Sequence, residues 1–176
     1  MIDDARTILF VGGARSGKSR LAQARAEAIA DRTGGELVFI ATAQLFDEEM
    51  RERIARHQSD RDERWRTIES PIDLPAAILR EGGVGRILLI DCLTLWMSNL
   101  ILSEADTDGA GEALVGSIAA AAARIMLVTN EVGMGIVPDN ALARHFRDEA
   151  GRLNQRVAAA VEEAQLVAAG LSLRIK

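Results

Sequence analysis

Near its amino end the chain carries a glycine-rich stretch whose residue types suit phosphate binding. It reads Gly12-Gly13-Ala14-Arg15-Ser16-Gly17-Lys18-Ser19 and lies between the apolar run Ile8–Val11 and an alanine-rich helical pattern over 19–31. Glycine lets the backbone wrap closely around an anion, and the amides at the start of the helix then point at it. A strand, a Gly-x4-Gly-Lys-Ser turn and a helix in this order predict a P-loop that binds a nucleoside triphosphate. The alternative is a chance glycine-rich turn.

Two side chains of this loop and one distant carboxylate could handle phosphate and metal. In a P-loop the Lys18 ammonium reaches the β- and γ-phosphates, and the Ser19 hydroxyl can coordinate Mg²⁺. Asp91 directly follows the apolar run Ile87–Ile90, which is where a carboxylate that holds Mg²⁺ is expected. Its alternative is an ordinary carboxylate that caps the next helix.

Short apolar runs alternate with helical patterns along the chain. The runs that predict strands are Ile8–Val11, Leu37–Ala41, Ile87–Ile90 and Ile125–Val128. The patterns that predict helices cover 19–31, 47–58, 74–80, 110–123 and 140–163. This alternation predicts an α/β fold, with a mostly parallel sheet sandwiched by helices. Residues 165–168 and 171–175 predict a closing hairpin, 103–111 predicts a loop, and residues 1–176 are expected to form a single domain.

The residues that follow the later predicted strands include a polar group at each strand end. They are Thr42 with Ala43, Asp91, and Asn130 with Glu131. Ligands of open α/β sheets bind at the carboxyl ends of the strands, so these residues are expected to share one crevice with the P-loop. Glu131 could orient a water molecule or accept a hydroxyl proton, and an uninvolved loop carboxylate is an equal alternative.

His57 is one of two histidines, and it lies in the predicted helix 47–58. Met50, Ile54 and His57 share one helical face, and this spacing alone favours a partly buried histidine without a chemical role. The other possibility is a nucleophile, because a neutral imidazole can attack phosphorus. His145 has no evident partner in the sequence and is interpreted as structural.

Composition narrows the classes of function. The net charge is −5, both signs are interspersed and only 3% of residues are aromatic, which argues against a nucleic-acid partner. The single cysteine, Cys92, excludes an intramolecular disulfide and a cysteine-rich zinc site. No uncharged apolar run approaches the ~20 residues of a membrane span, and the first residues lack a signal-peptide pattern. A cytoplasmic location is therefore expected.

Several separated motifs lie in one order along nearly the whole chain. They are Gly12–Ser19, Phe39–Ala43, Asp47–Met50 with Arg53-Ile54-x-x-His57, Trp65-x-Thr67-x-Glu69, Asp91–Trp96, Val128–Pro138 and Leu142–Asp148 with Gly151-x-x-Asn154-Gln155. In this order they resemble the bifunctional adenosylcobinamide kinase / adenosylcobinamide-phosphate guanylyltransferase family of cobalamin biosynthesis. The resemblance implies a RecA-like P-loop fold and a homotrimer.

The resemblance also implies two reactions and the residues that perform them. A nucleoside triphosphate, ATP or GTP, phosphorylates adenosylcobinamide, and GMP from GTP is then moved onto that phosphate. The implied catalytic residues are Lys18 and His57, with His57 carrying GMP covalently, and Ser19 and Asp91 hold Mg²⁺. The implied nucleotide-binding residues are Gly12, Gly13, Ala14, Arg15, Ser16, Gly17, Lys18, Ser19, Ala41, Thr42, Ala43, Gln58, Arg61, Glu69 and Asp91.

Two other functions fit the P-loop without the resemblance. One is a simple small-molecule kinase or NTPase with an incidental histidine, which forms no covalent nucleotidyl species. The other is a nucleotide-sensing module, which binds GTP tightly and turns it over negligibly. The resemblance favours the bifunctional enzyme.

Overall fold

The computed structural model describes residues 5–44 and 62–176. Their strands are β1 (Thr7–Gly12), β2 (Glu36–Ala41), β3 (Trp65–Glu69), β4 (Arg86–Asp91), β5 (Arg124–Asn130), β6 (Glu163–Ala168) and β7 (Leu171–Arg174). Their helices are α1 (Lys18–Thr33), α3 (Leu74–Glu81), α4 (Leu93–Leu102), α5 (Thr107–Ala120) and α6 (Ala141–Ala160).

The strands form one seven-stranded sheet in the order β3-β2-β4-β5-β1-β6-β7. Every neighbouring pair is parallel except β6 and β7, which form an antiparallel hairpin. Strand β5 lies between β1 and β4, so its end separates the glycine-rich loop from Asp91. The predictions of a mostly parallel sheet and of a carboxyl-terminal hairpin are confirmed.

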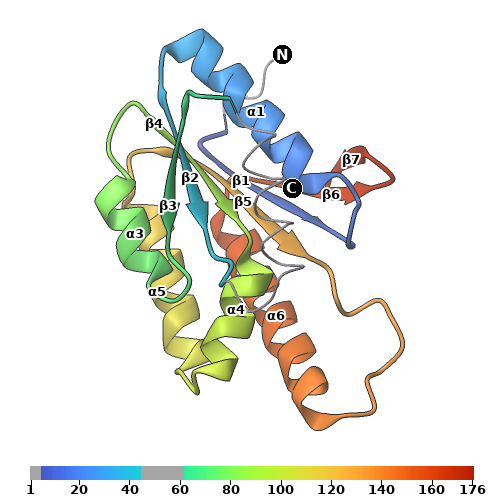
Figure 1. Cartoon of the computed structure of the whole chain (residues 1–176). Helices are drawn as coiled ribbons and strands as arrows, with labels where there is room; N and C mark the ends of the chain where they lie inside the picture. Colours follow the sequence, from blue (N-terminus) through green and yellow to red (C-terminus); the bar gives the residue numbers. More distant parts are fainter. Residues whose placement is uncertain (1–4, 45–61) are drawn as a thin grey trace.

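Both faces of the sheet are covered by helices (Figure 1). Along β1 the side chains alternate between two core clusters. Ile8 and Phe10 belong to the cluster that contains residues of α1, whereas Leu9 belongs to the cluster that contains residues of α3, α4, α5 and α6. These side chains are at most 2% exposed. Strands buried on both faces must be apolar at every position, which is why the strand signal in the sequence is a continuous run.

The sequence patterns did not predict strand β3 and helix α4. Strand β3 is an edge strand in which Arg66, Thr67 and Glu69 are exposed and no residue is fully buried, so it carries no apolar run. Helix α4 is apolar on nearly all sides and buries six of its ten residues, so it has no amphipathic period.

The loop predicted over 103–111 is wrong for its second half. Asp106 caps α5, because its carboxylate accepts a hydrogen bond from Gly109 N at 3.1 Å, and the helix begins at Thr107. Similarly, Asn140 accepts from Ala143 N at 2.7 Å and starts α6. The helix predicted over 140–163 ends at Ala160, before β6.

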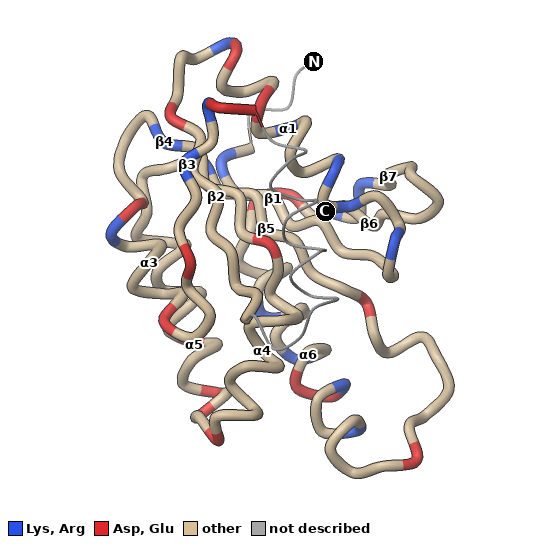
Figure 2. The backbone as a smooth tube through the Cα atoms, in the orientation of Figure 1, with Lys and Arg blue, Asp and Glu red and all other residues tan. Residues whose placement is uncertain are grey.

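Acidic and basic residues are interspersed over the described chain (Figure 2). Among the described residues, none of the helices combines the length and the apolarity that a membrane crossing requires.

Candidate active site

The glycine-rich loop connects β1 to α1. Gly17 has a φ of 96°, a left-handed conformation that favours glycine. Gly12 is buried, and a Cβ at this position would lie 2.2 Å from the carbonyl oxygen of Val167 in β6. The loop therefore needs Gly17 for its backbone conformation and Gly12 for the close approach of β6.

The hairpin of β6 and β7 supports the loop. The amide of Gly170, in the turn of this hairpin, donates to Ser16 O at 2.8 Å. A Cβ on Gly17 would lie 3.2 Å from Gly170 Cα. The loop is thus packed against a turn that is distant from it in the sequence.

The loop presents polar groups that an anion would satisfy. The Lys18 side chain is folded into the loop, where Nζ donates to Gly13 O at 2.9 Å. The Ser16 hydroxyl is buried and has no hydrogen-bond partner among the described residues. Helix α1 begins without a side-chain cap and without an acidic residue in its first turn, so no side chain in the described part of the chain caps the amides that a phosphate would bind.

Thr42 fixes the backbone next to Asp91. Asp91 ends β4 and is partly exposed, whereas Thr42, after β2, is fully buried. The Thr42 hydroxyl accepts from Cys92 N at 2.8 Å and donates to Cys92 O at 2.7 Å. Its side chain is therefore occupied by the protein, and it contributes to the site through the position of Asp91.

The ends of β2 and β3 are also joined. Ser70 N donates to Ala41 O at 2.8 Å, and the side-chain amide of Asn99 in α4 donates to Thr42 O at 2.8 Å and to Pro71 O at 2.9 Å. Because Ala41 pairs with Glu69 in the sheet, the exposed Glu69 lies at the same edge. Asn99 was not singled out in the sequence; a buried asparagine in an apolar helix is a weak signal for such a tie.

The end of β5 lies beside the glycine-rich loop. Glu131 N donates to Gly12 O at 3.0 Å, and Gly133 N donates to the Glu131 carboxylate. The predicted convergence of the P-loop, Thr42, Asp91 and Glu131 at one edge of the sheet is thus found.

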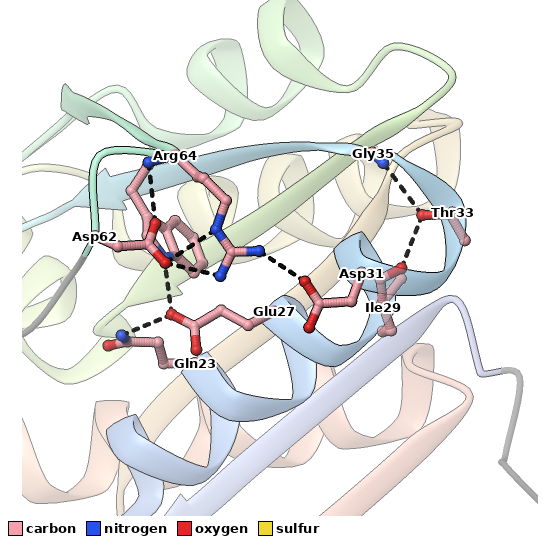
Figure 3. A network of polar contacts seen from close by, with 9 residues as sticks. Gln23, Glu27, Ile29, Asp31, Thr33, Gly35, Asp62 and Arg64 are labelled. Carbon is pink, nitrogen blue, oxygen red and sulfur yellow. Dashed lines mark hydrogen bonds and ion pairs between the residues drawn. The ribbon is translucent and has the colours of Figure 1, made fainter.

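Three predicted site residues, His57, Gln58 and Arg61, lie outside the described residues. The described chain resumes at Asp62 and is tied to α1 at once (Figure 3). The Arg64 guanidinium bonds to Asp62 and, at 2.7 Å, to Asp31 in α1. Trp65 Nε1 donates to Glu27 in the same helix at 3.0 Å.

The donors expected for a metal are oxygen atoms only. The Ser19 hydroxyl is in the first turn of α1 and the Asp91 carboxylate is at the end of β4. Residues 5–44 and 62–176 contain no cluster of three or more His, Cys, Asp or Glu side chains that could hold a metal ion. One hydroxyl and one carboxylate suit Mg²⁺, which takes its remaining ligands from phosphate and water. The donor set therefore fits this ion.

The sheet order, with the phosphate loop after β1 and β5 inserted between β1 and β4, is that of a RecA-like P-loop NTPase. Two solved structures share this fold. A KaiC-like protein from Pyrococcus horikoshii has a TM-score of 0.52 at 15% identity, covering 91% of this chain and 69% of its own. A second solved structure, an ATPase domain, has a TM-score of 0.51 at 11% identity, covering 92% of this chain and 69% of its own.

Residues 8–175 match the family described as cobinamide kinase / cobinamide phosphate guanyltransferase, CobU. The bifunctional adenosylcobalamin biosynthesis protein CobP of Pseudomonas aeruginosa is 46% identical, over 96% of both chains. The corresponding protein of Escherichia coli, CobU, is 40% identical, over 96% of this chain and 99% of the relative. The chain belongs to this family of bifunctional enzymes, and it is a kinase and guanylyltransferase.

Proposed function

We propose that this enzyme phosphorylates adenosylcobinamide with a nucleoside triphosphate and then transfers GMP from GTP onto the product. The final products would be adenosylcobinamide-GDP and pyrophosphate, with a His57–GMP intermediate between them. The observation that carries the proposal is the family match over residues 8–175, on a chain whose phosphate loop leads into an uncapped helix and holds an inward lysine.

In the kinase step the substrate hydroxyl attacks the γ-phosphorus. A new O–P bond forms, the bond to the β-phosphate oxygen breaks, and a nucleoside diphosphate leaves while the hydroxyl proton passes to a base. Lys18 and the amides of the loop neutralise the charge that develops on the phosphate oxygens.

In the guanylyl step an imidazole nitrogen of His57 attacks the α-phosphorus of GTP and pyrophosphate leaves. The phosphate of the corrinoid then attacks the same phosphorus and releases the histidine. In-line attack requires the nitrogen about 3–3.5 Å from phosphorus. The covalent step divides one difficult transfer into two easier ones.

Mg²⁺ is proposed on Ser19 and Asp91, where it would neutralise phosphate charge. The proposed nucleotide-binding set is that implied by the resemblance. The residues of this set that the structure describes lie at one edge of the sheet, which supports a role in nucleotide binding. The role of Thr42 differs from that of the others. Thr42 acts through Cys92 and Asp91, because its hydroxyl is already bonded twice.

The test is the intact mass of the enzyme after incubation with GTP and Mg²⁺. We expect an added GMP that is lost in acid and retained in base. His57→Ala should abolish the adduct, and His145→Ala is the matched control, because His145 is the other histidine and its side chain is 54% exposed. An adduct that persists in His57→Ala would remove this residue from the mechanism.

The same measurement separates the alternatives. A simple kinase would release a nucleoside diphosphate without any adduct or pyrophosphate. A sensing module would bind GTP with negligible turnover, even with the corrinoid supplied.

We further propose a homotrimer in the cytoplasm, in which residues 1–176 act as one domain. Strands from Thr7 to Arg174 share one sheet, which supports the single domain. Ile136 is 96% exposed, and Leu171 and Leu173 are exposed on edge strand β7; apolar surface of this kind favours an interface between subunits. Sedimentation equilibrium measures the oligomeric state.

A further inference from the structure

A buried asparagine in α4 holds the ends of two strands. The side-chain amide of Asn99 donates to Thr42 O, which directly follows β2, and to Pro71 O, which follows β3 after one intervening residue. Asn99 is 4% exposed, and the neighbouring Leu100 is an apolar core residue. A buried carboxamide costs free energy unless it is hydrogen-bonded, so these two bonds fix where the strand ends meet α4.

The same helix begins at the end of a third strand. β4 ends at Asp91 and α4 begins at Leu93, so Cys92 alone separates them. The hydroxyl of Thr42 is bonded to Cys92 N and Cys92 O, whereas its carbonyl is bonded by Asn99, about two helical turns further along α4. Helix α4 therefore fixes the ends of β2, β3 and β4 relative to one another.

Glu69, Ala41 and Asp91 form one row across these three strands, because Ala41 pairs with Glu69 on one side and with Asp91 on the other. Two strand spacings place the Cα atoms of the two acidic residues ~10 Å apart. Trp65 and Leu89 pack in the core cluster that contains residues of α1. Side chains alternate along a strand, so Glu69 and Asp91, four and two residues further on, face the same side of the sheet. Both carboxylates thus face the layer of α1, the helix that begins at the phosphate loop.

The strand order gives the two carboxylates different distances from the phosphate loop. Only β5 separates β4 from β1, whereas β3 is at the far edge of the sheet. In the proposed nucleotide site, Asp91 is therefore near the phosphates and the exposed Glu69 is near the nucleoside. A carboxylate accepts hydrogen bonds from the N–H and O–H groups of a nucleoside, and such a contact requires that the acceptor is held at the right place by its neighbours.

We propose that Asn99 is a positioning residue for the nucleoside of bound GTP. By joining the ends of β2 and β3 to α4, its carboxamide sets the place of Glu69 relative to Asp91. This role rests on the proposed nucleotide site.

The test separates the nucleoside from the phosphates. Titration calorimetry with Mg²⁺ and without corrinoid compares α,β-methylene-GTP, whose carbon bridge blocks the transfer of GMP, with inorganic tripolyphosphate. Asn99→Leu has a similar volume and removes the donors. It should weaken the GTP analogue about tenfold, as expected when a hydrogen bond to a charged group is lost. Tripolyphosphate should weaken less than about twofold, because Asp91 keeps its support from the Thr42 hydroxyl.

The positioning role is overturned if the GTP analogue binds Asn99→Leu as it binds the wild type. It is also overturned if tripolyphosphate loses as much affinity as the analogue, because the substitution then loosens the whole site. Ser117→Ala is the matched control, since it removes a buried hydroxyl that donates to a backbone carbonyl, Leu114 O, within α5 at 2.7 Å. Its affinities for both ligands should be those of the wild type.

A double-mutant cycle tests whether Asn99 acts through Glu69. Glu69→Ala alone should weaken the GTP analogue. Asn99→Leu added to it should cause less than about a twofold further loss, because the contact that Asn99 positions is already gone. Losses that add in full would contradict an action through Glu69.

A second variant covers the case in which Asn99→Leu does not fold. Asn99→Ser has a single hydroxyl that can donate to only one of the two carbonyls, and it should show the same split between the analogue and tripolyphosphate. A folded serine variant without this split refutes the positioning role.

These binding constants require neither the corrinoid nor His57. If the two-step chemistry fails while Asn99→Leu shows the split, the positioning role stands and the proposed reactions fall. If the chemistry succeeds and the split is absent, only the positioning role falls.

Discussion

The hydroxyl of Thr42 bridges the backbone N–H and C=O of Cys92, at 2.8 and 2.7 Å. Cys92 directly follows Asp91, so this bridge determines where the carboxylate of β4 leaves the sheet. The side-chain amide of Asn99 holds Thr42 itself, through a hydrogen bond to its carbonyl.

Replacement of Thr42 should affect stability and metal dependence together. Thr42→Val has nearly the same shape but leaves the Cys92 N–H unpaired, while Cys92 O keeps its hydrogen bond from Trp96 N at 3.2 Å. The unpaired N–H should cost about 1–3 kcal/mol in the free energy of unfolding. The Mg²⁺ concentration needed for half-maximal kinase rate should also rise. Thr42→Ser keeps the bridge and should be close to wild type in the Mg²⁺ titration. Wild-type behaviour of Thr42→Val in urea and in Mg²⁺ would contradict the bridge.

Gly12→Ala should destabilise the enzyme and weaken nucleotide binding. Its Cβ would lie 2.2 Å from Val167 O, so β1 and β6 would have to separate. Such overpacking costs typically about 1–3 kcal/mol. Gly13→Ala is the control, because its Cβ would meet no atom within 4 Å. Thermal unfolding compares the midpoint temperatures of the two variants. Equal midpoints would show that β6 moves aside without loss of stability.

We expect Glu81 to make the free energy of unfolding depend on pH at acidic pH. Its carboxylate, 9% exposed, bonds to Arg66 at 2.8 Å and Arg86 at 3.0 Å. The hydrogen bond from Arg66 lowers the pKa of Glu81 below its ordinary 4.5, although burial opposes the shift. The stabilisation is therefore complete well above pH 4.5 and is lost as the pH falls through the lowered pKa.

Urea unfolding between pH 7 and about pH 3 measures this dependence. Glu81→Gln should be less stable at pH 7 and should lose less stability on acidification. Glu112→Gln, on the exposed side of α5, is the control and should follow the wild type. Parallel curves for all three proteins would rule out a contribution from Glu81.

The Cys92 thiol should be inert in the folded enzyme. It is buried, and burial together with the charge of Asp91 raises its pKa to about 11. The reactive thiolate is therefore scarce at neutral pH. A disulfide reagent such as DTNB should label the enzyme only as it unfolds, with one thiol titrated in urea. Rapid native labelling would contradict the burial of Cys92.

The sequence predicted those elements whose signal is local. The apolar runs of β1, β2, β4 and β5 were sufficient, because burial on both faces requires apolar residues at every position. Strand β3 was missed because it is an exposed edge strand, which is recognised only from its pairing with β2.

The residues of the candidate site also divide into those that the local sequence predicts and those that it does not. Gly12, Gly17 and Lys18 could be predicted because the loop geometry itself demands these residue types. The hydrogen bonds that join Thr129 in β5 to Thr94 in α4 and to Asn154 in α6 could not be predicted, because they depend on how these two helices dock on β5. Threonine in a strand and asparagine in a helix give no sign of their partners.

The dependence of the phosphate loop on the turn at Gly170 has a consequence for synthesis on the ribosome. The loop at residues 12–19 is translated well before either neighbour of β1, because both neighbours come from residue 124 onward. A nascent chain therefore cannot complete its phosphate loop until the hairpin of β6 and β7 has emerged from the exit tunnel. GTP supplied during translation can stabilise only chains that already extend past this hairpin, and cannot help shorter ones to fold.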